Sequence, residues 1–535
     1  MIKSAIVGLS LSIMLLGAAG SAPAATADPA ARCAALRAPL IQGLVIETAA
    51  LVPAGRVKTG ASDTSQVELP AHCLFRATLG ARTGAAGQQL GIGIELRLPL
   101  EWNGGFLFQG GGGLDGVLGP SYGLVSGNHF PPALTRGYAV VATDGGHRAA
   151  SAIDPHFALD QQARLDYAYN ALDKTTLVAK ELIGRFYGSA PKHSYFVGCS
   201  NGGRQAMMAA ERLPLQFDGI VAGDPSFRLT RTNIDEAWNE IVLARAAPKD
   251  ANGRPIISQA LSPADLQLVS TAVLKQCDAR DGLADGMIND FRGCDFDPGV
   301  LTCTAGKTPQ CLSAIQITAL KTLMAGPHDS QGRALYAAFP YDAGISNQAY
   351  YRMHLGTSTD GTPNSADATL GFDTLRYLAM TPANPGFDVF GFDFDKDVAL
   401  TTESSKIVDA DATDLSSFAG HGKLLLYHGL SDQGLSPLDT LAWYEHLHAP
   451  TGSVRDWARL FMIPGMTHCA GGPATDQFDM LAAIVAWVEQ GTAPERIIAR
   501  GDAFPGQSRP LCASPQIARY SGGDPHNADS FRCQL

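Results

Sequence analysis

Residues 198–202 (GCSNG) have the pattern G-x-S-x-G, in which a serine stands between two glycines. A short apolar run at 194–197 precedes the pattern and predicts a buried strand, and residues 205–212 predict a helix. A serine on a tight turn between a strand and a helix is exposed at the carboxyl end of a sheet, where it can attack a carbonyl carbon. We expect glycines on both sides because a side chain there would collide with neighbouring backbone. The pattern therefore predicts that Ser200 is a nucleophile.

A serine hydroxyl is a weak nucleophile until a histidine takes its proton and a carboxylate orients that histidine. In sheets of this kind the acid and then the histidine follow the serine along the chain, each in a loop after a strand. The strand-like run 423–427 is followed by Asp432, and the run 458–463 is followed by His468. The order and the positions predict a catalytic triad of Ser200, Asp432 and His468.

Two other histidines also lie near predicted strands. His147 follows the run 138–142, but it precedes the serine, so the chain order disfavours it as the base. We interpret His428, at the end of the run 423–427, as a structural histidine.

Two cysteines are the direct neighbours of proposed catalytic residues: Cys199 precedes Ser200, and Cys469 follows His468. If the serine and the histidine touch, the two sulfurs lie close enough to form a disulfide. Such a bond would hold the serine turn against the histidine loop, where small displacements are costly to catalysis.

The remaining eight of the ten cysteines have spacings that favour local disulfides. The predicted pairs are Cys33 with Cys73, Cys277 with Cys294, Cys303 with Cys311, and Cys512 with Cys533. Free buried thiols are the alternative, because spacing alone does not determine connectivity. A zinc site is a weaker alternative, since the sequence contains no C-x-x-C.

A glycine-rich segment at 109–116 (QGGGGLDG) follows another predicted strand. In serine hydrolases with this strand order, a loop at this place supplies the second N–H of the oxyanion hole. We assign the hole to the backbone N–H groups of Gly113 and Asn201. A phosphate-binding loop is the alternative, but no G-K-[ST] follows the glycines.

In an acidic loop at 277–290, three carboxylates lie close together with intervening glycines: Asp278, Asp281 and Asp285. Oxygen ligands of this kind suit Ca²⁺, although the spacing differs from that of an EF-hand. An exposed acidic turn without metal is the alternative. The loop lies away from the predicted triad segments in the chain, so we expect a bound metal to be structural.

Strand-like runs alternate with helical patterns in two parts of the chain, which predicts an α/β fold with a mostly parallel sheet. The strands are expected at 91–98, 105–109, 138–142, 194–197, 423–427 and 458–463, and the helices within 160–186, 205–212 and 480–490. The intervening segment is loop-rich and aromatic. We therefore expect a catalytic domain at 28–223 and 406–535, interrupted by an inserted domain at 224–405.

The first 27 residues have the layout of a secretory signal peptide: Lys3, an apolar stretch at 5–19 and small residues at 21–27. No later segment is apolar over the ~20 residues that a membrane span requires. The net charge of −11 over 535 residues, without a long basic run, argues against a nucleic-acid-binding protein. We expect a secreted or periplasmic protein with no nucleic-acid or membrane partner.

The combination of Gly198-Cys199-Ser200-x-Gly202-Gly203, Asp432, His468-Cys469 and the acidic loop resembles the tannase and feruloyl esterase family. The resemblance covers nearly the whole chain after residue 27. It implies an α/β-hydrolase fold with a large inserted lid and a structural calcium ion. It also implies the calcium ligands, which are the side chains of Asp278, Asp281 and Asp285 and the carbonyls of Leu283 and Met287.

The resemblance also concerns the substrate pocket. A family member that cleaves terephthalate monoesters holds the free carboxylate with an arginine a few residues before a Gly-Phe pair. Here that pair is Gly371-Phe372, and the corresponding residue is Ala368. Arg352 or Arg376 is the alternative cation. Phe372 and Leu435 are candidate pocket walls, with ordinary core packing as the alternative.

These observations predict a secreted serine esterase that hydrolyses small-molecule carboxylic esters of aromatic acids, of the feruloyl or galloyl type, through an acyl-enzyme. A terephthalate monoester hydrolase of the same family is the alternative. A secreted peptidase and a non-catalytic, calcium-stabilised binding protein are alternatives of other classes.

Overall fold

The computed structural model describes residues 28–38, 41–58, 66–84, 87–124, 129–449 and 451–535. The predicted signal peptide at 1–27 lies outside the described residues. None of the helices in the described ranges has the length and apolar character needed to span a membrane.

A nine-stranded sheet forms the centre of the molecule, with strand order β1-β4-β5-β7-β6-β8-β9-β10-β11. Its strands are β1 (Leu44–Val52), β4 (His72–Thr83), β5 (Gln89–Pro99), β6 (Gly105–Gln109), β7 (Ala139–Thr143), β8 (His193–Cys199), β9 (Gly219–Gly223), β10 (Lys423–Gly429) and β11 (Ala458–Ile463). From β7 to β11 all neighbouring strands are parallel. The predicted mostly parallel sheet is confirmed. Three antiparallel strands extend it: β5, which matches the strand predicted at 91–98, and β1 and β4, which we did not predict.

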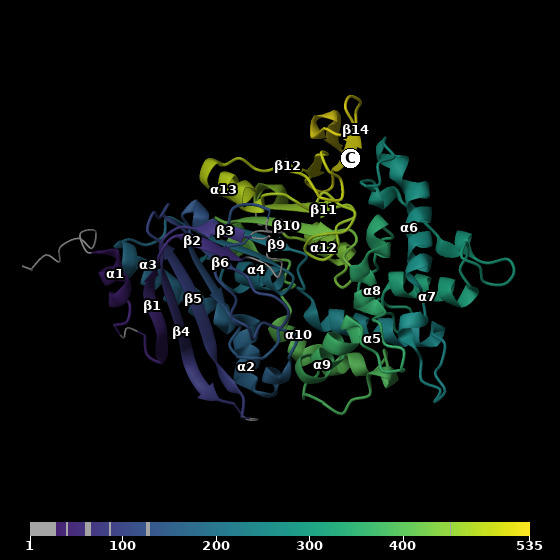
Figure 1. Cartoon of the computed structure of the whole chain (residues 1–535), viewed down its shortest axis with the longest axis horizontal. Coiled ribbons are helices and arrows are strands. Elements are labelled where there is room, and N and C mark those ends of the chain that lie inside the picture. Colours follow the sequence, from purple (N-terminus) through teal and green to yellow (C-terminus); the bar gives the residue numbers. More distant parts are fainter. Residues whose placement is uncertain (1–27, 39–40, 59–65, 85–86, 125–128, 450) are drawn as a thin grey trace, which may run out of the picture.

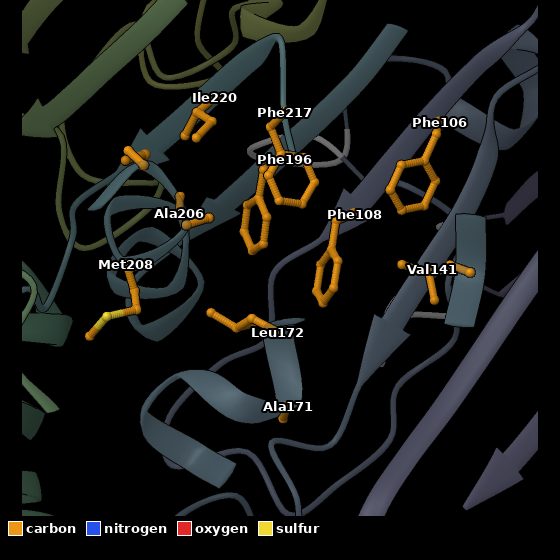
Figure 2. Packing of buried hydrophobic residues seen from close by; sticks show 14 of the residues in the cluster. Phe106, Phe108, Val141, Ala171, Leu172, Phe196, Ala206, Met208, Phe217 and Ile220 are labelled. Atoms are coloured by element: carbon orange, nitrogen blue, oxygen red, sulfur yellow. The ribbon is translucent and has the colours of Figure 1, made fainter. Parts of the chain in front are cut away.

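Apolar side chains of the sheet alternate between two buried faces, as the period-2 geometry of a strand requires. In β6, Phe106 and Phe108 point to one face and Leu107 to the other. Figure 2 shows the first face, where Phe108 and Phe196 lie near Leu172. This face is covered by α3 (Ala171–Tyr187), α4 (Asn201–Arg212) and α12 (Pro437–Glu445), and the other by α13 (Met480–Gln490).

The helix predicted at 160–186 is divided into two helices. A π-helical turn at Asp166–Asn170 separates α2 (Gln161–Leu165) from α3. The fully buried Arg204 of α4 donates to the carbonyl oxygens of Tyr167 (3.0 Å) and Ala168 (3.3 Å) within that turn. The carbonyl oxygens of the π-helical turn accept hydrogen bonds from Arg204, so this contact connects α4 to the segment that joins α2 and α3.

Residues 224–405, all of them described, contribute no strand to any sheet. Their helices are α5 (Leu229–Ala246), α6 (Pro263–Cys277), α7 (Ala314–Ala325), α8 (Gln348–His354), α9 (Phe372–Thr374) and α10 (Thr402–Val408), the last of which crosses the predicted boundary at 405. Figure 1 shows α5 to α9 gathered on one side of the molecule, beside the sheet. Two apolar clusters of their own hold these helices together. We call residues 224–405 the lid.

The other elements lie outside the central sheet and the lid. They are α1 (Pro29–Ala35), α11 (Ser416–Ala419) and three two-stranded sheets: β2 (Gly55–Lys58) with β3 (Gln66–Leu69), β12 (Arg496–Ala499) with β13 (Arg509–Cys512), and β14 (Ile517–Tyr520) with β15 (Phe531–Gln534).

Candidate active site

Ser200 occupies the turn between β8 and α4 with a φ of 63°, a conformation that non-glycine residues seldom adopt. The predicted crowding at the flanking glycines is present. A Cβ on Gly198 would lie 2.4 Å from the carbonyl oxygen of Gly202, and one on Gly202 would lie 2.7 Å from that of Gly111. The close backbone packing therefore requires glycine at both positions, and it holds the serine in its strained turn.

The structure brings the three predicted triad residues into one chain of hydrogen bonds. The Nε2 atom of His468 lies 2.8 Å from the Oγ atom of Ser200. The Nδ1 atom of His468 lies 2.7 Å from the Oδ2 atom of Asp432. The strands β8, β9, β10 and β11 are parallel neighbours, so the loops that carry these residues meet at one edge of the sheet.

Asp432 is buried, yet its surroundings favour the carboxylate. Its Oδ1 atom accepts hydrogen bonds from the backbone N–H groups of Gly434 (2.9 Å) and Leu435 (3.0 Å). Burial alone would raise the pKa of Asp432, but the positive charge and hydrogen bond of His468 outweigh it and hold the pKa well below its usual range. Burial also disfavours the charged form of His468 and so lowers its pKa, but Asp432 raises that pKa by more. The pKa of His468 is therefore above that of free histidine.

Two further buried residues, Asp224 and His428, lie beside the triad, and sequence reasoning placed neither of them there. One carboxylate oxygen of Asp224 lies within 4.8 Å of a carboxylate oxygen of Asp432 and of a ring nitrogen of His468. The Nε2 atom of His428 lies 3.4 Å from Asp432 Oδ2 and 3.7 Å from Asp224 Oδ1. His428 is therefore structural, as interpreted, but the carboxylates that it contacts belong to the active site. Asp224 directly follows the apolar run of β9, a signal of the same kind as the one that identified Asp432.

Cys199 and Cys469 form a disulfide across 270 residues of sequence. The same four local pairs that the spacing favours are also bonded: Cys33–Cys73, Cys277–Cys294, Cys303–Cys311 and Cys512–Cys533. All ten cysteines are paired, so no thiol is free for zinc.

His147, the alternative base, lies away from the serine. Its ring stacks on Phe157 with the centroids 3.8 Å apart, and neither ring nitrogen has a hydrogen-bond partner among the described residues. Burial lowers the pKa of His147 to about 4.

Gly113 and Asn201, the predicted oxyanion-hole residues, both border the pocket into which Ser200 and His468 point. A buried network orients them. The side chain of Asn201 donates to Asp115 (2.5 Å) and accepts from Tyr167 (3.0 Å), so both of its polar atoms have buried partners. Burial raises the pKa of Asp115 to about 7.

The pocket beside Ser200 has about 640 Å³ of free space, including its open mouth. Its walls are mainly apolar and come from the sheet domain and the lid; they include Leu114, Leu229, Met353, Leu370 and Leu435. No lysine or arginine is among its lining residues.

Leu435 lines the pocket, as predicted, but Phe372 does not. Phe372 packs in the lid core, with its ring edge-on to that of Phe390 at 5.5 Å. The arginine alternatives do not reach the pocket either: Arg352 is exposed, and Arg376 binds the carbonyl of Phe387 (3.0 Å).

The family model for tannase and feruloyl esterase matches residues 78–534. The chain belongs to this family. It is 42% identical over 518 residues to mono(2-hydroxyethyl) terephthalate hydrolase of Piscinibacter sakaiensis, covering 88% of this chain and 86% of the relative. It is 30% identical over 470 residues to a probable feruloyl esterase of Arthroderma benhamiae, covering 83% and 82%.

The crystal structure of feruloyl esterase B from Aspergillus oryzae superimposes with a TM-score of 0.78 at 26% identity, over 95% of this chain and 100% of that one. Tannin acyl hydrolase from Aspergillus niger shares the fold, with a TM-score of 0.70 at 23% identity, over 93% of each chain. These matches, together with the family model, identify this tannase-family protein as an ester hydrolase.

The acidic loop of this tannase-family chain has an all-oxygen donor set, which is the chemistry that Ca²⁺ requires. Asp278 accepts from the backbone N–H groups of Asp285 (3.2 Å) and Gly286 (2.9 Å). Asp281 accepts from the amide of Asn289 (2.7 Å), and burial raises the pKa of Asp281 to about 6. Asp285 pairs with Arg509 (2.6 Å).

Asp278 and Asp281 therefore have no cationic partner among the described residues, which fits a loop that takes up a cation. The three carboxylates are not, however, among the groups of described residues whose ligating atoms lie within 4.8 Å of one another. Calcium binding by these carboxylates and by the carbonyls of Leu283 and Met287 stays a prediction.

Proposed function

We propose that this protein hydrolyses carboxylic esters of aromatic acids, with hydroxycinnamoyl or galloyl esters as the substrate class. The observation that carries the proposal is the continuous hydrogen-bonded chain Asp432–His468–Ser200, which opens onto a pocket with apolar walls. An arene fits such walls, and a few polar groups orient it. Two of the similar proteins are named as a probable feruloyl esterase and as feruloyl esterase B, and these names refer to hydroxycinnamoyl esters.

In the first half of the reaction His468 removes the proton of Ser200 as its Oγ atom attacks the ester carbonyl. Asp432 stabilises the resulting imidazolium. The backbone N–H groups of Gly113 and Asn201 donate to the oxyanion of the tetrahedral intermediate, and one such donor supplies ~3–4 kcal/mol of transition-state stabilisation. The imidazolium then protonates the leaving alcohol, and an acyl-serine ester remains.

In the second half water replaces the alcohol. His468 takes a proton from the water molecule as its oxygen attacks the acyl carbonyl, and the imidazolium returns this proton to Ser200 Oγ as the acid leaves. The strained turn keeps Ser200 in position throughout both halves.

A turnover panel of methyl ferulate, methyl gallate and mono(2-hydroxyethyl) terephthalate tests this function, with kcat/KM compared among them. We expect the first two to be preferred. Ser200→Ala should abolish turnover of all three and leave the melting temperature nearly unchanged. Hydrolysis of all three esters by Ser200→Ala would contradict the assigned nucleophile.

A terephthalate monoester hydrolase is the second candidate, because the relative with 42% identity carries that name. The pocket argues against it, since none of its lining residues is a lysine or arginine that could pair with the substrate carboxylate. A kcat/KM for the terephthalate monoester above that for methyl ferulate would favour this candidate.

Turnover assays also test the two alternatives of other classes, a peptidase and a non-catalytic binding protein. Cleavage of feruloyl peptides faster than of feruloyl esters would indicate a peptidase. Absence of turnover with every ester would indicate a binding protein.

We further propose an extracellular or periplasmic location. Five disulfides are bonded in the described residues, and disulfides persist in oxidising compartments. Export of the expressed full chain, with loss of residues 1–27 detected by mass spectrometry, tests this proposal.

We also propose that the acidic loop binds a structural Ca²⁺ ion through Asp278, Asp281 and Asp285 and the carbonyls of Leu283 and Met287. The lack of a cationic partner for Asp278 and Asp281 among the described residues supports the proposal. When bound, the ion would supply charge compensation that stabilises the lid, and no step of the reaction uses it. Chelation should lower the melting temperature before it changes turnover of the folded enzyme. Loss of turnover with the fold intact would contradict a structural role.

A further inference from the structure

One face of α5 forms part of the pocket wall. Leu229, Thr232, Asn233 and Glu236 all border the pocket, and their spacing of three, four and seven residues places them on one side of the helix. The start of α5 lies near the nucleophile, because the backbone N–H of Ser226 donates to the carbonyl oxygen of Ser200 (3.2 Å). Since a helix rises ~1.5 Å per residue, Glu236 lies ~10 Å beyond Leu229. The part of the pocket wall that α5 forms therefore runs from Leu229 to Glu236, and Asn233 and Glu236 lie at its end farther along the helix from Ser226.

This end of the pocket contains a buried polar pair. Asn233 Nδ2 donates to Glu236 Oε2 at 2.6 Å, and the two residues are 2% and 4% exposed. Asn233 Oδ1 is buried and has no hydrogen-bond partner among the described residues. An acceptor buried without a donor is destabilising, so this oxygen is suited to a donor on a ligand. A Cβ on Gly371 would lie 2.7 Å from Glu236 Oε2, so the glycine of the Gly371-Phe372 pair leaves room for the acid.

We infer that Asn233 and Glu236 form the hydrogen-bonding end of the acyl pocket, and that they select an acyl group with a hydroxyl on its arene over one with a carboxylate. The inference rests on the proposed esterase function and deepens it. A phenolic hydroxyl donates to Asn233 Oδ1. A carboxylate donates nothing to this oxygen, and among the described residues no lysine or arginine lines the pocket to balance its charge.

The electrostatics of Glu236 support the selection. Burial raises the pKa of Glu236 to about 8; the carboxyl of Asp367 acts in the same direction, and the hydrogen bond from Asn233 opposes it. The side chain is therefore neutral at pH 7 and can both donate to and accept from a hydroxyl. Above that pH it becomes a second anion beside the arene. The discrimination against a carboxylate should therefore increase as the pH rises through about 8.

Three esters that differ only at the para position test the inference: methyl 4-hydroxycinnamate, methyl cinnamate and the methyl ester of 4-carboxycinnamate. For the wild-type enzyme we expect kcat/KM for the hydroxyl compound to exceed that for methyl cinnamate by ~10-fold or more, and that for the carboxylate by more still. Asn233→Leu should reduce the first ratio to near unity. Glu236→Gln should remove the change near pH 8 from the ratio of hydroxyl to carboxylate.

Asp235→Asn is the matched control, because Asp235 lies on the same helix and does not line the pocket; it should leave all ratios unchanged. 4-Nitrophenyl acetate, which is too short to reach Asn233, separates two failures. If it and the three cinnamates are hydrolysed and the cinnamates have equal kcat/KM, the inference is overturned and the esterase function stands. If none of the esters is hydrolysed, the proposed function fails and the inference fails with it. The ratios of the wild-type enzyme decide the matter even if Asn233→Leu does not fold.

Discussion

Two aspartate–histidine pairs in this molecule have the same contact distance and opposite charge states. In the active site, Asp432 Oδ2 lies 2.7 Å from His468 Nδ1. In the lid, Asp367 Oδ2 also lies 2.7 Å from His354 Nδ1. In the first pair the histidine pKa is raised and the aspartate pKa is lowered. In the second, burial lowers the pKa of His354 to about 4 and raises that of Asp367 well above its usual range.

The difference lies in the other neighbours of each carboxylate. Asp432 accepts from two backbone N–H groups and faces a second histidine, His428. The Oδ1 atom of Asp367 has no hydrogen-bond partner among the described residues.

Three more buried acids of the lid lie on α5, namely Asp235, Glu236 and Glu240. Burial raises the pKa of each, and the nearby carboxyl of Asp367 is a smaller cause in the same direction. A single contact therefore does not determine whether a buried pair is ionic. Whether such a pair is ionic depends on how many hydrogen-bond donors and like charges surround the carboxylate.

The largest difference is expected when each aspartate is replaced by its amide. Asp432→Asn should reduce kcat/KM by ~10⁴-fold, because the amide cannot stabilise the imidazolium and favours the wrong tautomer of His468. Asp367→Asn should change kcat/KM by less than tenfold, because the amide resembles the neutral acid already present. Steady-state kinetics with methyl ferulate measures both. Similar losses in the two variants would contradict the proposed difference in charge.

A second contrast uses the disulfides of the two regions. Replacing both Cys199 and Cys469 by alanine should destabilise the protein by ~2–4 kcal/mol and lower kcat, because that bond holds the serine turn to the histidine loop. Removal of Cys303–Cys311, which closes a separation of only 8 residues in the lid, should cost less stability and leave kcat unchanged. Denaturant unfolding and initial rates distinguish the two. A normal kcat in the first double variant would show that packing alone positions His468.

A third experiment tests whether a buried acid of the lid, Glu240, is neutral, by measuring how protein stability depends on pH. Burial raises the pKa of Glu240 to about 8, so the unfolded chain releases its proton at lower pH than the folded one. This group therefore reduces stability as the pH rises from about 4.5 to about 8. Glu240→Gln should stabilise the protein at pH 8 by on the order of 1–3 kcal/mol and have no effect at pH 4. Melting temperatures at the two pH values measure this, and destabilisation at pH 8 would indicate an ionised Glu240.

The smallest effect is expected at Asp224, the second carboxylate that faces His468. The base must be neutral to act, so kcat/KM should rise with pH through an apparent pKa above 6.5, the ordinary value for histidine. Asp224→Asn should lower that apparent pKa by about one unit or less and change the plateau rate by less than tenfold. A pH profile of kcat/KM provides the test. An unchanged profile would show that Asp224 acts only through its hydrogen bond to the Gly429 N–H.

Much of the active site could be predicted because local sequence determines local backbone. The glycines around Ser200 are required by close packing within one turn, and Asp432 and His468 follow strands that were recognisable from their apolar runs. The proximity of Cys199 and Cys469 followed from their adjacency to two residues that must touch. Asp224 carried a similar signal, since it follows a strand directly, but a strand of five residues rich in glycine and alanine is difficult to recognise.

The pocket could not be predicted in the same way. Phe372 was a candidate wall, yet it packs in the lid core, and Asn233 and Glu236 had no motif to mark them. Their position depends on how α5 and the segment around Leu370 approach the sheet edge. That approach depends on packing between segments distant in sequence, to which no single pattern corresponds.

The sequence by itself determined the nucleophile, its base and acid, the proximity of Cys199 and Cys469, and the mostly parallel sheet, because each depends on position along the chain or on the order of neighbouring strands. Only the tertiary structure decided which buried carboxylates carry charge and which side chains end the acyl pocket. Both depend on the sum of donors, charges and apolar atoms that reach a point from several elements, and this sum exists only after the lid has packed against the sheet.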